Sequence, residues 1–481
     1  MAEFSSELSC PADEDDVTMS MHPGPNRLSI SDLHESVDDP ALTSMTLLNE
    51  LAGRYPDAVS FSAGRPFEGF YDVENLSRHL TTFRNYLEDE IGLPAEQVRR
   101  TFFQYGRTKG FIHGLIARQL EADEGLTVNP ESIVVTTGCQ EAMVLVLRAL
   151  VRDTRDVILA ATPNYVGFIG AARVAGAPLR PVREGEGGID LEDLERQIGA
   201  ARREGLRPRA CYVVPDFANP SGASMSLADR GALLELARRE GILVIEDNPY
   251  SLFSSGNSPL PMLKSLDEHH QVIHLGSFAK SAFAGARVGY IIADQPVTSS
   301  GVCAEDPVLL ADHLAKLKSM VTLNTSTVAQ AVIGGYLLEN GCSLKRATAR
   351  EAGVYRRNLA AVLEGLESVF GPRHEMAQDV TWNTPQGGMF VVVTLPFLAD
   401  DDMLEYSASK FGVLWTPMHH FYGGTGGFHQ ARLSFSVLTA DQITLGVERL
   451  GELVEDQRGK RLVGAAVAAG GRGQVLAPRI G

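Results

Sequence analysis

The sequence predicts an α/β fold with two domains. We expect a large domain with a mostly parallel seven-stranded sheet covered by helices on both faces, and a smaller α+β domain built from the C-terminal part and the N-terminal segment. In the middle of the chain, short β-branched runs alternate with segments of helix length, which is typical of strands joined by crossover helices. After about residue 305 the pattern changes to long helices and then strands. With 481 residues and 44% hydrophobic content, the chain is long enough for two cores.

The expected strands of the large sheet are short apolar runs. They lie at 132–137, 156–161, 210–216, 241–247, 271–277 and 286–293. The segments between them have helical patterns. In residues 226–241, Leu227, Leu233, Leu234 and Ala237 form an apolar stripe, and Gly241 follows as a stop signal. This strand-helix-strand order predicts the parallel sheet.

The second half of the chain predicts the smaller domain. Helices are expected over 325–341 and 343–370, strands near 380–395 and 430–436, and a final helix from about 440. Both ends look dispensable, because the first is rich in acids, serine and proline and the last in glycine and alanine. We therefore divide the chain into a disordered tail (1–26), an N-terminal segment joining the small domain (27–80), a large domain (81–325), a small C-terminal domain (326–460) and a flexible tail (461–481).

Composition excludes several classes of partner. The net charge of -17 and the lack of a basic stripe argue against nucleic acid. No run of eighteen or more apolar residues could cross a membrane, and the start of the chain lacks the basic and apolar regions of a secretory signal. The cysteines are odd in number and lack metal-ligand spacing, so we expect reduced thiols, no metal site and a cytoplasmic location. They are Cys10, Cys139, Cys211, Cys303 and Cys342.

Four loops that follow expected strands carry unusual residues. Ligands of such sheets bind beyond the carboxyl ends of the strands, so these loops are where chemistry is expected. Most of the residues also have an ordinary explanation as turn residues or as a solvated lysine. The acids at 246–247 differ, because a carboxylate that ends an apolar strand loses hydration unless a cation or donors meet it. The loops contain Gly138-Cys139-Gln140, Asn219, Asp247 and Lys280.

Taken together, Asn219, Asp247, Lys280 and Arg287 resemble the pyridoxal-phosphate (PLP)-dependent aminotransferases of fold type I, class I/II. That family has Asn-Pro-x-Gly, then Asp-x-x-Tyr, then Ser-x-x-Lys with an arginine seven residues on, and the sequence contains the whole pattern. The resemblance covers roughly residues 45–455. The segment 102–120 is most similar to the aminoadipate and kynurenine aminotransferase branch. The segment 33–66 is similar to dihydroxyphenylglycine-type transaminases of natural-product and antibiotic biosynthesis.

The resemblance implies PLP as the cofactor, bound in the domain at 81–325. It gives catalytic roles to Lys280, Asp247 and Tyr250. Lys280 would hold the aldehyde as a Schiff base and then move the substrate proton. Asp247 would pair with the ring nitrogen and keep it protonated. Asn219 and Tyr250 would contact the ring hydroxyl oxygen. Tyr165 would stack on the ring face, although core packing explains it equally well.

The resemblance also implies a phosphate site and a homodimer. Backbone N–H groups at a helix start would hold the phosphate, together with a hydroxyl and a guanidinium. The matching tyrosine of relatives, here Tyr105, reaches the phosphate from a neighbouring subunit. The expected phosphate site therefore contains Gly138, Cys139, Gln140, Ser277, Arg287 and Tyr105.

The substrate would be held by residues outside the large sheet. Arg432 matches the family's carboxylate-binding arginine, and the alternative is an arginine at the protein surface. Gly64 lies in a segment that folds over the substrate in relatives, and Asn219 would border the same pocket. Relatives have Pro-Gly where this sequence has Met418 before His419 and His420. These histidines would either line a pocket for an aromatic or hydroxylated side chain or form a hydrogen-bonded loop.

The activity implied by the resemblance is transamination. The enzyme would move an amino group between an L-amino acid and a 2-oxo acid by a ping-pong mechanism, with an aromatic or non-proteinogenic substrate. Elimination, decarboxylation or oxidation on the same cofactor is the alternative, since Lys280 and Asp247 would serve any of them. A non-catalytic effector-binding module fused to a DNA-binding domain is disfavoured, because roughly forty acidic N-terminal residues cannot supply a winged helix.

Overall fold

A computed structural model describes residues 28–39, 48, 50–256, 259–298, 308–372, 376, 379–423 and 425–470. The predicted tail at 1–26 lies outside these residues, as do residues 471–481. The chain divides into two units, residues 1–39 and 40–481. The described part of the first unit holds two short 3-10 helices, η1 (Ile30–Asp32) and η2 (Glu35–Asp38). Ser29 caps η1, because its side chain accepts the Ser31 N–H.

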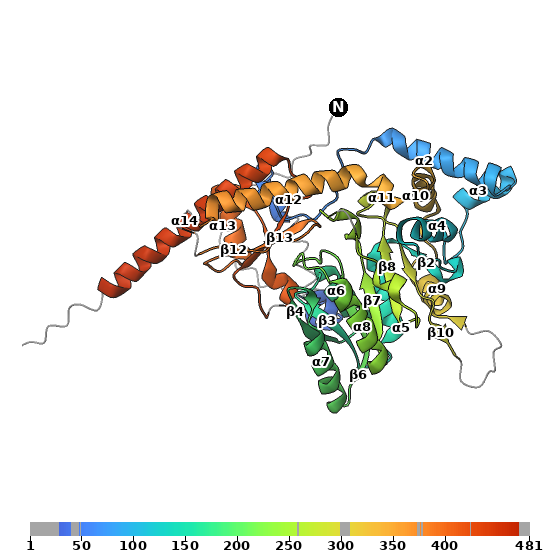
Figure 1. Cartoon of the computed structure of the whole chain (residues 1–481), viewed down its shortest axis with the longest axis horizontal. Coiled ribbons are helices and arrows are strands. Elements are labelled where there is room, and N and C mark those ends of the chain that lie inside the picture. Colours follow the sequence, from blue (N-terminus) through green and yellow to red (C-terminus); the bar gives the residue numbers. More distant parts are fainter. Residues whose placement is uncertain are drawn as a thin grey trace, which may run out of the picture. The chain divides into compact units, whose positions relative to one another are not determined.

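The second unit is built on a large sheet (Figure 1). Its central strands β3, β4, β6, β7 and β8 pair in parallel, while β9 runs antiparallel between β2 and β8. The mostly parallel sheet is confirmed. In spatial order the strands are β2 (Ile133–Thr136), β9 (Gly289–Ile292), β8 (Val272–Ser277), β7 (Leu243–Asp247), β6 (Arg207–Val213), β3 (Asp156–Thr162), β4 (Leu179–Gly185) and β5 (Gly188–Ile189).

The sheet has eight strands rather than the seven predicted. The additional strand is β5, which has two residues and pairs with β4 at the edge. Both were absent from the apolar runs in the sequence, because β4 reads LRPVREG and is only partly buried. An edge strand is covered on fewer sides, so it can keep charged residues.

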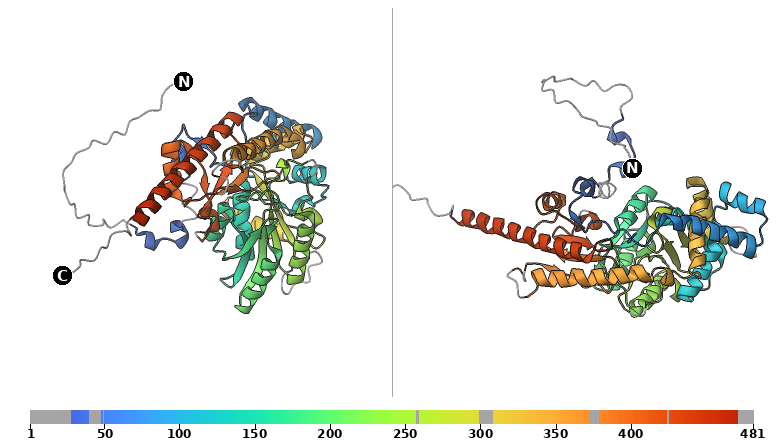
Figure 2. Two further views of the ribbon diagram at one scale, coloured as in Figure 1. Left: turned by 60° about the vertical axis from the view of Figure 1, so that its left-hand side comes forward. Right: turned by 90° about the horizontal axis from the view of Figure 1, so that it is seen from above.

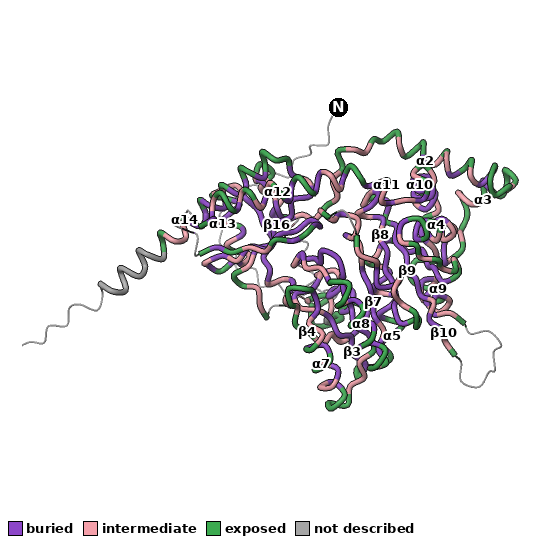
Figure 3. Tube along the Cα trace, in the orientation of Figure 1, coloured by how far each residue is buried: buried purple, intermediate pink, exposed green. Residues whose placement is uncertain are grey.

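Helices cover both faces of the large sheet, as predicted. Ile245 of β7 packs with one set of helices, while its neighbour Val244 packs with the other. The strands between them are buried, as Figure 3 shows. One set is α5 (Gly138–Leu150), α6 (Val166–Ala175) and α9 (Leu310–Val321); the other is α7 (Leu191–Arg203) and α8 (Leu227–Glu240).

Helix α8 follows its sequence signals closely. Ser226 caps its start by accepting the Asp229 N–H, and Gly241 ends it with φ of 60°. One side chain departs from the apolar stripe. Arg230 is fully buried, donates to Asp216 at 2.6 Å, and also donates to the Pro261 carbonyl. This ion pair fixes the loop that leads from β6 to Asn219.

Replacing Arg230 with leucine is expected to lower the free energy of unfolding by about 3–5 kcal/mol, because Asp216 would stay buried without its cation. Urea denaturation measures the loss. Arg238→Leu on the same helix is the matched control, since Arg238 pairs with Glu235 at the surface and should contribute less than about 1 kcal/mol. Equal losses in the two variants would contradict the argument.

A smaller antiparallel sheet forms the second core. Its strands lie in the order β12 (Thr381–Trp382), β13 (Phe390–Thr394), β16 (Gln430–Ser434) and β15 (Thr416–Pro417). It packs with α12 (Ala349–Phe370), α13 (Asp401–Phe411) and α14 (Ala440–Gly470). Figure 2 shows α12 and α14 side by side. Helix α14 continues past residue 460, into the predicted C-terminal tail.

The N-terminal segment packs into this smaller core. β1 (Val59–Ser60) pairs in parallel with β14 (Val413–Leu414), and Phe61 is fully buried there. Residues 62–65 follow directly after this pairing and line a cavity that is described below.

Helices α2 (Val73–Asn85), α3 (Ala95–Phe103), α4 (His113–Glu124) and α10 (Thr327–Glu339) pack with β2 and β9 in a third cluster. Helix α10 belongs to this cluster, whereas α12 belongs to the smaller core, and the division of the chain at 325/326 stays a prediction. The remaining elements are η3 (Tyr86–Glu90), η4 (Pro130–Ser132), η5 (Ser251–Phe253), η6 (Leu263–Leu266), η7 (Ala284–Ala286), η8 (Met418–Tyr422), β10 (Pro296–Val297), β11 (Val308–Leu309) and α11 (Leu344–Ala347). None of the helices in the described ranges combines the length and apolar character that crossing a bilayer requires.

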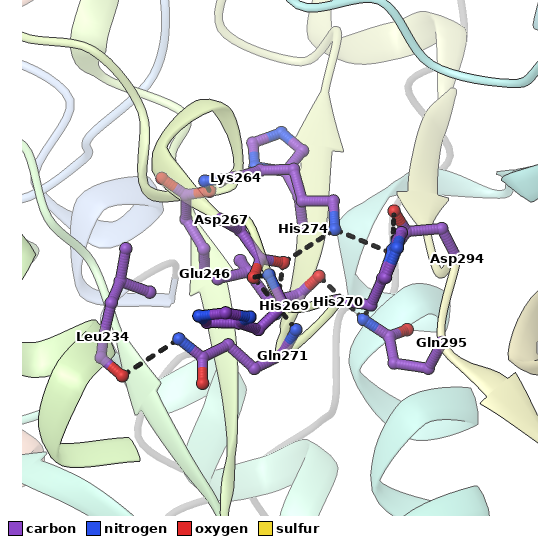
Figure 4. Close-up of polar contacts among 11 residues, drawn as sticks. Leu234, Glu246, Lys264, Asp267, His269, His270, Gln271, His274, Asp294 and Gln295 are labelled. Carbon is purple, nitrogen blue, oxygen red and sulfur yellow. Dashed lines mark hydrogen bonds and ion pairs between the residues drawn. The ribbon is translucent and has the colours of Figure 1, made fainter. Parts of the chain in front are cut away.

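A buried polar cluster joins β7 and β8 to the segment that contains Leu263 and Lys264 (Figure 4). Glu246 accepts the N–H groups of Leu263 and Lys264 at 2.7 and 3.0 Å, and His274 Nδ1 lies 3.0 Å from the same carboxylate. Lys264 in turn pairs with Asp267 at 2.9 Å. Since Glu246 points away from Asp247 along the strand, this cluster holds the backbone that presents Asp247.

Candidate active site

The ends of the parallel strands border a cavity of about 360 Å³, which we call the strand-end cavity. Asp247 ends β7, Ser277 ends β8, and Lys280 follows three residues later. The cavity brings together the predicted residues Cys139, Gln140, Tyr165, Asn219, Asp247, Tyr250, Ser277, Lys280 and Arg287.

Asp247 is a buried carboxylate with no cationic partner among the described residues. Its oxygens accept from the Tyr212 hydroxyl at 2.7 Å and the Cys139 thiol at 3.6 Å. Loss of hydration raises the pKa of Asp247 to about 6, although these two donors oppose the shift. A cationic group in the strand-end cavity would restore the ionised form, so the site suits a protonated ring nitrogen.

The start of helix α5, at the same cavity, suits an anion. Helix α5 begins at Gly138, so the first N–H groups of the helix have no intrahelical partner. The Arg287 side chain lies across this helix start, and an added Cβ on Gly138 would come within 2.4 Å of its Nη2 atom. Gly138 also has a φ of +75°, which favours glycine. Ser277 supplies a hydroxyl in the same cavity, so the groups required by a phosphate are present.

Lys280 faces the N-terminal segment. Its Nζ donates to the Gly64 carbonyl at 2.5 Å. Loss of hydration, together with the charges of Arg432 and Arg287, lowers the pKa of Lys280 to about 8. A larger fraction of the amine is therefore neutral near pH 8 than for a solvated lysine, which favours its action as a nucleophile or base. An added Cβ on Gly64 would lie 2.7 Å from the Phe390 ring, so glycine permits this close approach.

Arg432 lies on β16 as a buried guanidinium, 6% exposed. It donates to Asn219 Oδ1 at 2.6 Å and the Ser62 carbonyl at 2.8 Å. Its planar group lies over the rings of Phe390 and Phe421, at 4.5 and 4.9 Å. Burial lowers the pKa of Arg432 to about 10. Among the described residues it has no carboxylate partner and its Nε has no hydrogen bond, so it is placed to receive a carboxylate.

A second cavity of about 500 Å³ adjoins the first. We call it the segment cavity, because residues 58–60 and 62–65 of the N-terminal segment form part of its wall. Its lining combines apolar side chains such as Val59 and Leu438 with a hydroxyl pair, Ser60 and Ser62, whose oxygens lie 2.8 Å apart. The two cavities share Tyr165, Asn219, Tyr250 and Lys280.

Four predicted residues line neither cavity: Gly138, Tyr105, His419 and His420. Tyr105 is 82% exposed at the surface of the single chain. His419 and His420 turn toward Asp401 instead, so the structure fits the alternative of a loop held by polar contacts.

Sequence reasoning missed three side chains at the site: Tyr212, Phe390 and Thr416. The hydroxyl of Tyr212 in an otherwise apolar strand was a usable signal, because a buried tyrosine oxygen requires a partner. Phe168 stacks on its ring, with centroids 3.6 Å apart. Phe390 and Thr416 gave no such signal, since they reach Arg432 only through the register of the small sheet.

Comparisons with known proteins agree with this geometry. The family model of aminotransferase class I and II matches residues 71–450. The (S)-3,5-dihydroxyphenylglycine transaminase of Amycolatopsis orientalis is 51% identical, over 89% of this chain and 95% of the relative. The 2-aminoadipate transaminase of Thermus thermophilus is 32% identical, over 83% of this chain and 91% of the relative.

A solved structure shares the fold as well. The multiple substrate aminotransferase from Thermococcus profundus aligns with a TM-score of 0.75 and 28% identity, covering 89% of this chain and 99% of that one. The family match spans most of the chain. The protein therefore belongs to the class I and II aminotransferases and is a PLP-dependent transaminase of fold type I.

Proposed function

We propose that the strand-end cavity holds PLP and that the segment cavity holds the side chain of the amino-acid substrate. When bound, PLP supplies an aldehyde that exchanges amino groups and a ring that accepts an electron pair. The N–H groups at Gly138, Cys139 and Gln140, with Ser277 and Arg287, would bind its phosphate. Tyr165 would lie against its ring.

Two residues would carry the chemistry around the ring. Asp247 would hold a proton on the ring nitrogen, because the buried carboxylate has hydrogen-bond donors but no cation of its own. Lys280 would anchor the cofactor covalently and, once displaced, move the proton of the substrate carbon. Asn219 and Tyr250 line both cavities and would orient the ring hydroxyl oxygen.

Arg432 carries the proposal for substrate binding. A buried guanidinium with an unpaired Nε, held beside Lys280 by Asn219 and the Ser62 carbonyl, fits the carboxylate of an amino acid. Asn219 and Gly64 would border that carboxylate. The wall of the cavity therefore orients the substrate carbon toward the lysine.

The segment cavity supports an aromatic, hydroxylated substrate. Its apolar wall suits an aryl ring, and the hydroxyls of Ser60 and Ser62 suit phenolic oxygens. The 51% identity to a 3,5-dihydroxyphenylglycine transaminase supports an arylglycine of this kind and a role in antibiotic biosynthesis.

We also propose a homodimer in the cytoplasm. Tyr105 is exposed in the single chain and would contact the phosphate of a second copy. The cysteines in the described residues, Cys139, Cys211 and Cys342, are free, which supports a reducing compartment.

Single-turnover experiments test the activity. Mixing the holoenzyme with 3,5-dihydroxyphenylglycine should convert the bound cofactor to its amine form and release one 2-oxo acid per site. We expect kcat/KM for this donor to exceed that for 2-aminoadipate at least about tenfold, because the apolar wall of the segment cavity suits an aryl ring and would desolvate a charged side-chain carboxylate. Release of carbon dioxide, ammonia or a peroxide while the cofactor stays in its aldehyde form would instead indicate decarboxylation, elimination or oxidation.

A further inference from the structure

Two histidines and a carboxylate converge beside the active site. Asp401 begins α13, while His419 and His420 are neighbours in η8. His420 Nε2 lies 2.8 Å from Asp401 Oδ1, and His419 Nε2 lies 3.7 Å from Oδ2. The two imidazole rings are 4.1 Å apart, so both face one carboxylate from adjacent positions.

His419 lacks the hydrogen bonds that a buried imidazole requires. The contact of its Nε2 with Asp401 is longer than a hydrogen bond. Its Nδ1 is buried and has no partner among the described residues, and only 17% of the side chain is exposed. His419 Nε2 therefore faces the carboxylate without a hydrogen bond that would hold it there.

A metal ion accounts for the arrangement. In a tetrahedral zinc site with bonds of about 2.0–2.2 Å, the ligand atoms lie about 3.3 Å from one another. The two histidine-to-carboxylate distances bracket this value, and the three ligand atoms all lie within 4.8 Å of each other. We propose that Asp401, His419 and His420 bind a divalent transition metal of the zinc type, with water completing the coordination.

The residue types of the site also suit a cation, because a carboxylate and two imidazoles are ligands that zinc-type ions prefer. The sequence did not suggest the site, because Asp401 lies far from the histidines in the chain and only the fold brings α13 to η8.

The metal would tie the start of α13 to the loop that supports Arg432. Phe421, which follows His420, lies under the Arg432 guanidinium, and its carbonyl accepts the Asn164 N–H at 2.8 Å. These three ligands would act as positioning residues, since they contact neither cavity.

Cobalt binding tests the proposal. The untagged holoenzyme, cleared of metal with a chelator, is titrated with Co²⁺ and followed by ligand-field absorption at wavelengths beyond the cofactor bands. We expect about one ion per chain, displaced by Zn²⁺. Asp401→Asn, His419→Ala and His420→Ala should each weaken binding at least about tenfold while the variants still melt cooperatively.

The matched control is the other adjacent histidine pair. His270 lies 2.9 Å from Asp294 beside His269, but both histidines are exposed. The double variant His269→Ala/His270→Asn should bind Co²⁺ like the parent protein. Failure of the parent protein to bind Co²⁺ and Zn²⁺, or binding that survives all three ligand variants, would overturn the proposal. These measurements do not depend on turnover, so they stand apart from the proposed substrate.

Discussion

Replacing Lys280 with alanine is expected to lower turnover at least about 10³-fold. The variant loses the amine that would anchor the cofactor, and it also loses the group placed to move the substrate proton, a role worth about 10²–10⁴-fold by itself. The lowered pKa of Lys280, about 8, keeps a useful fraction of this amine neutral. Release of the 2-oxo acid from a saturating donor measures the loss.

Two further variants make the Lys280 result specific. Lys280→Arg keeps a cation but cannot act as a nucleophile at ordinary pH, so it should be as inactive as the alanine variant. Lys316→Ala removes an exposed lysine and should leave turnover unchanged. More than a tenth of the parent activity in Lys280→Ala would show that another group performs the proton transfer.

Replacing Arg432 with alanine is expected to reduce kcat/KM for amino-acid donors by about 10²–10³. Truncating one partner of a buried, hydrogen-bonded charge pair costs about 2–5 kcal/mol, and each 1.4 kcal/mol is a factor of ten. Arg432→Lys should recover part of the loss, since lysine restores the charge without the planar fork. Most of the change should appear in KM, because the carboxylate is bound before and during the reaction.

Arg65 is the alternative candidate for the arginine that binds the substrate carboxylate. It also lines the segment cavity, and nothing in its position excludes contact with an anion. Arg65→Ala should change kcat/KM much less than Arg432→Ala. A larger loss in Arg65→Ala would make Arg65 the carboxylate ligand and Arg432 a support for Asn219.

Much of the fold could be predicted because the central strands are buried on both faces. Such strands read as continuous apolar runs: β7, β8 and β9 fall within runs identified from the sequence, and β3 and β6 overlap such runs. β4 and β5 carry no such pattern, because β4 is only partly buried and β5 has two residues, so both were missed. Which core α10 joins depends on its packing against α2, and the sequence of α10 alone does not reveal that contact.

The site was predictable where a motif fixes both a residue and its place on a strand. Asp247, Ser277 and Lys280 follow strand ends, so the topology alone brings them together. The environment of Arg432 could not be predicted, because Phe390, Phe421 and the Ser62 carbonyl come from three distant parts of the chain. Only the register of the small sheet sets their distances.

The N-terminal segment has a consequence for defining the minimal catalytic unit. The family model begins at residue 71, yet the carbonyls that accept from Arg432 and Lys280 belong to Ser62 and Gly64. A truncated protein that starts at the family boundary would keep Lys280 and Asp247 but lose both acceptors and the pairing of β1 with β14. Any fragment, fusion or transplanted domain made from this enzyme must therefore begin before Val59.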